Sequence, residues 1–188
     1  MIQHIHRPRA TAYVAAITTA VVVAASGCGS NNEPTPPPAV STSAAPSPAP
    51  AGVDDRDPDQ VMLWSANQLY SWRPAQDASA AAGFDRARPL LDPTYIQQVG
   101  ASAAGLARVT GASWARWAAD NATITASSRI TGDDHPADTG SKHQRVVEIT
   151  QRISAPGITE PDRTVIAYMV AARQPGTDQW RVSMISPR

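Results

Sequence analysis

The sequence predicts an α+β domain in which helices come first and an antiparallel sheet follows. In the first half of the domain, apolar side chains recur at helical spacing behind helix-start signals. In the second half the apolar period becomes two, in four segments that turn residues separate. A run of helices followed by a run of strands is typical of folds in which the helices pack on one face of the sheet.

The first helix is expected to begin at Asp57-Pro58. Aspartate is a good N-cap acceptor, and proline fits the first helical position because its missing N–H has no partner there anyway. Three aromatic or branched residues fall on one face of this helix: Val61, Trp64 and Trp72. Pro74 would end it.

Two shorter helices are expected next. Residues 80–87 form one, with Asp77 or Ser79 as its cap. A third helix begins at Asp92-Pro93, which repeats the signal of the first, and continues to Val99. Residues 100–112 are rich in Gly, Ala and Ser, and their pattern does not distinguish a helix from a strand or a loop.

The strands are expected over residues 122–130, 144–153 and 163–173, with a last strand marked by Trp180, Val182 and Met184. The third is apolar on both faces, as a central strand would be. The short segments between the strands carry Gly, Pro and Asp, which favour hairpins. We therefore expect a four-stranded antiparallel meander, and if it curves around the helices it would enclose a cone-shaped cavity.

The first 27 residues have the features of an export signal. A basic start precedes an apolar run of 15 residues, Thr11–Ala25, and small residues precede Cys28, the single cysteine. A cysteine in this place resembles a bacterial lipobox, in which the thiol is lipidated and the cysteine becomes the mature N-terminus. The alternative is an uncleaved anchor, but a membrane span needs about 20 apolar residues. We expect a lipoprotein on the outer leaflet of the cytoplasmic membrane.

Residues 28–52 are predicted to be a disordered tether between the lipid and the domain, which spans 53–188. Seven of the 17 prolines lie in residues 33–51, and X-Pro steps favour extended geometry. Removal of residues 1–27 would leave 14 basic against 16 acidic residues, a balance of about −2. Such a balance argues against a nucleic-acid partner. A single cysteine excludes a disulfide within the chain.

The motifs around the expected helices and the last strand resemble those of a known superfamily. They are Trp72-Arg73-Pro74-Ala75 with Asp77, Arg86 to Leu91, and Trp180-Arg181-Val182. Together they resemble the cone-shaped nuclear transport factor two-like domains of exported actinobacterial, mycobacterial-type lipoproteins. They are also similar to the conjugation scaffold domains of the TcpC and VirB-eight type. The resemblance implies a cone-like fold and a protein-interaction role. The chain departs from the scaffold proteins by having a lipid anchor where they have a transmembrane helix.

The sequence carries no recognisable catalytic motif. His135 and His143 lie in or beside the acidic segment 133–138, but without the spacing of a zinc or calcium site. We interpret this segment as a solvated hairpin and expect no metal and no cofactor. The strand faces expected to point inward are mainly apolar, so we also expect no enzymatic activity.

The candidate pocket or interface residues are Trp114, Arg116, Trp117 and Tyr168. The two tryptophans either fill the core or line a cavity mouth or partner surface, where Trp and Arg are enriched. Arg116 between them would suit an acidic partner. Tyr168 is interpreted as a core tyrosine with a satisfied hydroxyl group.

The expected function is protein interaction or scaffolding at the cell envelope, with a link to secretion or conjugation. The alternative is a module that binds an apolar small molecule or lipid in the cone. A binder needs an open apolar cavity of roughly 300 Å³ or more, whereas a scaffold has that space filled by side chains.

Overall fold

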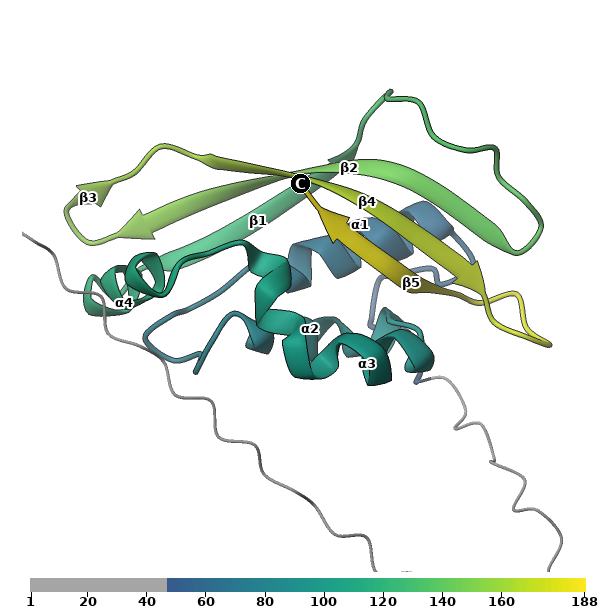
Figure 1. Cartoon of the computed structure of the whole chain (residues 1–188), viewed down its shortest axis with the longest axis horizontal. Helices are drawn as coiled ribbons and strands as arrows, with labels where there is room; N and C mark the ends of the chain where they lie inside the picture. Colours follow the sequence, from purple (N-terminus) through teal and green to yellow (C-terminus); the bar gives the residue numbers. More distant parts are fainter. Residues whose placement is uncertain (1–46) are drawn as a thin grey trace, which may run out of the picture. The chain divides into compact units, whose positions relative to one another are not determined.

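The computed structural model describes residues 47–188 (Figure 1). The signal peptide, Cys28 and the tether up to residue 46 lie outside the described residues. The helical elements are α1 (Pro58–Leu69), α2 (Ala81–Ala87), α3 (Pro93–Val99) and α4 (Gly111–Ala119), with 3₁₀ segments η1 (Arg88–Leu90) and η2 (Gly100–Ala107). The strands are β1 (Thr123–Ile130), β2 (Lys142–Ala155), β3 (Ile158–Thr159), β4 (Arg163–Arg173) and β5 (Trp180–Pro187).

The α+β class is confirmed. The sheet is antiparallel in the order β1-β2-β4-β5, and the two-residue β3 pairs with β2. The register places Val147 opposite Ala167 in the central pair. In Figure 1 the helices lie on one side of the sheet. None of the helices within residues 47–188 is both long and apolar enough to cross a membrane.

The side chains between the helices and the sheet form the core. On β2 and β4 the odd-numbered residues face the helices, as the alternating burial of β4 from Val165 to Ala171 indicates. Large, fully buried apolar side chains come from both layers and include Tyr70, Trp72, Phe84, Leu90, Ile149 and Met169. Burial of this apolar area is the main stabilising contribution to the fold.

Two of the predicted helix starts are confirmed. The Asp57 carboxylate accepts hydrogen bonds from the N–H groups of Asp59 and Gln60 at 2.9 and 3.3 Å. The Asp92 carboxylate does the same for the first turn of α3. Each cap satisfies N–H groups that the helix itself leaves without partners.

The prediction that the first helix carries Trp72 and ends at Pro74 is wrong. Helix α1 ends at Leu69, and Trp72 pairs with Ile124 of β1 through two backbone hydrogen bonds of 2.9 and 2.8 Å. The segment after α1 therefore adds a bridge to the edge of the sheet. Trp72 is 1% exposed, whereas Trp64 on α1 is only half-buried.

Of the two caps expected for the second helix, Ser79 contacts its start and Asp77 does not. The Ser79 hydroxyl accepts a hydrogen bond from the N–H of Ala81, the first residue of α2, at 3.3 Å. Asp77 instead accepts a hydrogen bond from the N–H of Arg73 at 2.8 Å and pairs with Arg86 at 2.9 Å. The carboxylate thus closes the turn that joins α1 to α2, which is a turn role typical of aspartate.

Candidate functional site

Helix α4 carries three of the four candidate residues. Thr110 caps it, its hydroxyl accepting a hydrogen bond from the N–H of Ser113 at 3.1 Å. Trp117 is 4% exposed, and the half-buried Trp114 packs edge-on against Trp72 with ring centroids 5.8 Å apart. Both indoles fill the space between α4 and the rest of the domain.

Arg116 and Trp117 both contact Glu160, which follows β3. The Arg116 guanidinium donates to the Glu160 carboxylate, and the indole N–H of Trp117 donates to the same group at 3.3 Å. The hydrogen bond from Arg116 lowers the pKa of Glu160 and raises that of Arg116. These contacts hold the β3–β4 turn against α4.

A surface hollow of about 330 Å³ lies between α4 and the start of β4. We call it the arginine hollow, and it is lined chiefly by Arg108, Arg116, Arg163, Trp117, Ile153 and Glu160. Neither Arg108 nor Arg163 was among the residues expected from the sequence.

Arg163 reaches the hollow from the first position of β4. Its guanidinium donates to the Gln151 side-chain oxygen at 3.0 Å and to the carbonyl of Arg108 at 2.8 Å. Gln151 is fully buried and donates in turn to the carbonyl of Tyr70 at 2.7 Å. This chain of hydrogen bonds connects the hollow to the end of α1.

All acceptors of Arg163 in the described residues are uncharged. The carboxylate ion pairs found within residues 47–188 include neither Arg163 nor Arg108. Burial lowers the pKa of Arg163, and the neighbouring positive charge of Arg108 lowers it further. Arg163 is therefore a partly desolvated cation beside a like charge.

Arg108 adopts a left-handed backbone conformation with φ of 50°. It ends η2, a place where glycine or asparagine is usual because a Cβ atom is disfavoured there. Its guanidinium donates to the carbonyl of Pro187 at 3.2 Å, which links η2 to the end of β5. The turn brings this second cation to the mouth of the hollow.

Tyr168 lies apart from the α4 residues. Its even position on β4 places it on the sheet face away from the helices, where it is half-buried, so its interpretation as a core tyrosine is wrong. It lines a second hollow of about 390 Å³ with Val170 and Met184. The guanidinium of Arg188 lies 4.2 Å from the centre of its ring.

Tyr70 and Tyr95 are core tyrosines. Their hydroxyl groups donate to the carbonyls of Leu106 at 3.2 Å and Ile185 at 3.4 Å. Burial raises the pKa of both phenols, that of Tyr95 to about 12. Both groups therefore stay protonated and structural.

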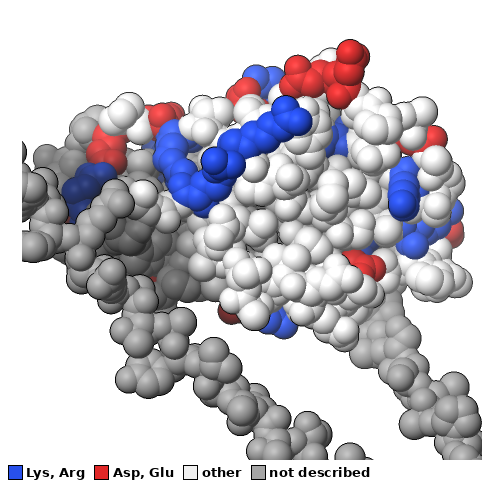
Figure 2. All heavy atoms as spheres, viewed as in Figure 1, with Lys and Arg blue, Asp and Glu red and all other residues white. Residues whose placement is uncertain are grey.

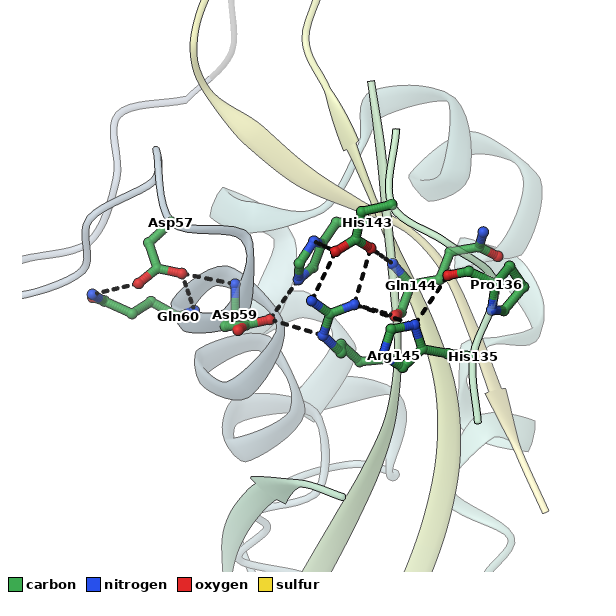
Figure 3. Close-up of polar contacts among 9 residues, drawn as sticks. Asp57, Asp59, Gln60, His135, Pro136, His143, Gln144 and Arg145 are labelled. Carbon is green, nitrogen blue, oxygen red and sulfur yellow. Dashed lines mark hydrogen bonds and ion pairs between the residues drawn. The ribbon is translucent and has the colours of Figure 1, made fainter. Parts of the chain in front are cut away.

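The solvated-hairpin interpretation fails for His143. This residue lies on β2 with a side chain only 12% exposed, between Asp59 at 2.6 Å and Asp138 at 3.0 Å. Arg145 bridges the same two carboxylates at 3.5 and 2.9 Å, and Figure 3 shows its guanidinium beside His143, with both side chains contacting Asp59. The cluster ties α1 to the β1–β2 connection.

Arg145 also determines the electrostatics of this cluster. Its hydrogen bonds hold the pKa of Asp138 at about 2. Within residues 47–188 no group of three or more His, Cys, Asp or Glu side chains is arranged to hold a metal ion.

A third hollow, of about 460 Å³, lies beside Trp72 and Arg73. Its inner cation, Arg86, pairs with Asp77 at 2.9 Å and also donates to the carbonyl of Ser71. Arg86 already has a carboxylate partner, so its charge is balanced within the domain. Arg163 in the arginine hollow differs from it in this respect.

Comparison of the chain with protein-family models, curated proteins and solved structures gives no match. The chemistry of the site must therefore be inferred from the geometry of the described residues. In the face shown in Figure 2, basic side chains lie among acidic ones and form no continuous basic surface.

Proposed function

We propose that this chain is an exported lipoprotein whose domain acts as a protein-interaction or scaffold module at the cell envelope. Cys28 carries the lipid, which anchors the protein in the outer leaflet of the cytoplasmic membrane. Residues 28–52 act as the tether. The proposal includes no catalytic role and no cofactor.

The anchor is supported by the sequence alone. The only cysteine follows an apolar run and three small residues, which is where a lipoprotein signal requires it. A diacylglyceryl group supplies two acyl chains, and two chains give stable attachment where one gives reversible binding. The proline-rich tether would keep the domain away from the bilayer surface.

The interaction role is supported by one observation, the filled interior. Between helices and sheet, the large side chains of Tyr70, Trp72, Phe84 and Met169 are at most 1% exposed. The three hollows are open on the surface, and charged side chains line each of them. A ligand enclosed in the core would need space that these side chains occupy, so recognition on the surface is favoured.

The fold and setting are proposed from the resemblance of the sequence motifs. We propose a cone-like domain of the nuclear transport factor two-like type, with a partner in a secretion or conjugation apparatus. The α+β order and the antiparallel meander are consistent with it.

The anchor is tested by metabolic labelling with a fatty acid. The wild-type chain should take up label and lose residues 1–27, and Cys28→Ser should abolish both. Moving the thiol in a Cys28→Ser, Ser30→Cys double variant should not restore labelling, because the signal requires the original position. An unlabelled wild-type chain would contradict the anchor.

The interaction role is tested by in-cell photo-crosslinking. A crosslinking residue in place of the exposed Ala115 on α4 is compared with one in place of the exposed Ser127 on β1. Mass spectrometry should identify defined envelope proteins, captured preferentially at one position. Recovery of a stoichiometric lipid and no protein would favour the small-molecule module instead.

A further inference from the structure

Four arginines within residues 47–188 are partly or fully buried, and one of them differs from the others in its partners. Arg86 pairs with Asp77 at 2.9 Å. Arg181 is 1% exposed and pairs with Asp55 at 3.0 Å. Arg145 is nearly as enclosed and pairs with Asp138 at 2.9 Å. Arg163 is also partly buried, yet only amide and carbonyl oxygens of the described residues accept its hydrogen bonds.

A desolvated cation without an anion is unfavourable, and proteins usually pair such groups. Arg108 makes the situation worse because its positive charge lies close enough to lower the pKa of Arg163. A carboxylate in the arginine hollow would remove both costs. Guanidinium groups bind carboxylates through two parallel hydrogen bonds, which adds geometric specificity.

We propose that the arginine hollow is the docking site for an acidic, partly apolar segment of a partner protein. One carboxylate of that segment contacts Arg163 and Arg108. This inference rests on the proposed interaction function, whose partner chemistry it specifies.

The surroundings of the two cations favour a peptide carboxylate over other anions. The half-buried Val109 and the exposed Pro161 offer apolar surface next to the charged groups. Glu160 and Asp162 also line the hollow, and they would repel a phosphate dianion or a nucleic-acid backbone. A ligand with a single carboxylate next to an apolar side chain is complementary to a site that combines cations, apolar surface and two carboxylates.

The size and the polar rim agree with this occupant. A volume of about 330 Å³ accommodates one or two side chains of an extended segment. Thr110 and Ser113 line the hollow at the beginning of α4, where the positive end of a helix dipole favours an anion.

The test uses the full chain purified in detergent and two fluorescein-labelled octapeptides. One alternates glutamate with leucine, and the other has glutamine in place of each glutamate. Fluorescence anisotropy should show binding of the acidic peptide only, weakened by added salt. Equal binding of both peptides, or no binding of the acidic one, would overturn the proposal.

The variants locate the binding. Arg163→Gln and Arg108→Gln should each weaken binding of the acidic peptide about tenfold or more, which corresponds to about 1.4 kcal/mol. Arg129→Gln is the matched control, since Arg129 is an exposed arginine on β1 that pairs with Glu148. It should leave the affinity unchanged.

Folding of each variant is checked by thermal denaturation. Arg108 is exposed, and within residues 47–188 its side chain donates a single hydrogen bond, to the carbonyl of Pro187, so its variant remains informative if Arg163→Gln unfolds. Unchanged affinity in a folded Arg108→Gln variant would overturn the two-arginine contact. Displacement of the peptide by inorganic phosphate at equal concentration would identify a phosphate site and overturn the peptide assignment.

The same variants separate this inference from the proposed function. If the crosslinked envelope partner persists in Arg163→Gln and Arg108→Gln cells, the docking site is wrong and the interaction role stands. If no protein partner is captured by the wild-type chain, the interaction role itself fails.

Discussion

Replacing Gly83 with alanine should destabilise the domain because α2 crosses the end of α1 at this glycine. A Cβ atom at Gly83 would lie 2.2 Å from the carbonyl oxygen of Leu69 and 2.8 Å from the indole nitrogen of Trp72. Ordinary Cβ contacts begin at 3.4 Å. The Leu69 oxygen belongs to the backbone, so the clash requires the two helices to separate.

The expected magnitude combines two opposing effects. In an exposed helix, Gly→Ala stabilises by about 1 kcal/mol. Overpacking a core typically costs about 1–3 kcal/mol, and an overlap of more than about 1 Å with the backbone belongs at the upper end of that range. The net loss is therefore about 2 kcal/mol. At about 4 °C per kcal/mol for a domain of this size, Tm should fall by roughly 8 °C.

The assay is thermal unfolding followed by circular dichroism, with Gly111→Ala as the matched control. Gly111 is the first residue of α4, and a Cβ atom there meets nothing within 4 Å. Its variant should unfold at the wild-type temperature or slightly above. If Gly83→Ala were as stable as Gly111→Ala, the close approach of α1 and α2 would be refuted.

Three further predictions concern other contacts. Asp55→Asn should destabilise the domain by about 3 kcal/mol in urea denaturation, because it removes the carboxylate that pairs with the buried Arg181. The double variant with Arg181→Met should recover most of the lost stability. An additive loss in the double variant would contradict this explanation. The Asp138 carboxyl should titrate near pH 2 by NMR, and Arg145→Gln should return its pKa towards about 3.9. Because the Asp138 pKa is depressed in the folded state, the stability that its ion pair with Arg145 contributes is present above about pH 4 and is lost as the pH falls towards 2. An unchanged Asp138 titration in Arg145→Gln would show that Arg145 does not cause the shift. Trp117→Ala should cost about 3–5 kcal/mol, because the indole is buried. A loss below about 1 kcal/mol would show that this side chain does not fill the core.

Local signals in the sequence predicted the elements where those signals are strong. The caps at Asp57 and Asp92 and the alternation along β1 and β2 each depend on a few neighbouring residues. Sequence patterns contain that information directly. The order of the four long strands followed from short turn segments between them.

The elements that were mispredicted depend on partners distant in the chain. Helical spacing placed Trp72 on the first helix, but its backbone bonds to Ile124 end the helical segment earlier. Tyr168 has apolar neighbours on both sides along β4, so the pattern alone did not show which face the helices cover. Only the packed sheet decides these cases, because periodicity gives the faces of a strand without saying which one is buried.

One residue of the arginine hollow could have been recognised in the sequence by its position. An analysis that follows only apolar residues along a strand overlooks it. Arg163 is in phase with Val165, Ala167 and Met169, the buried face of a strand. A charged residue in that phase must find an acceptor in the interior or at its edge. His143 shows the same pattern on β2, in phase with buried apolar residues, and two carboxylates contact it, Asp59 of the distant α1 and Asp138 of the preceding connection. Polar residues in phase with a buried face therefore mark where long-range contacts form.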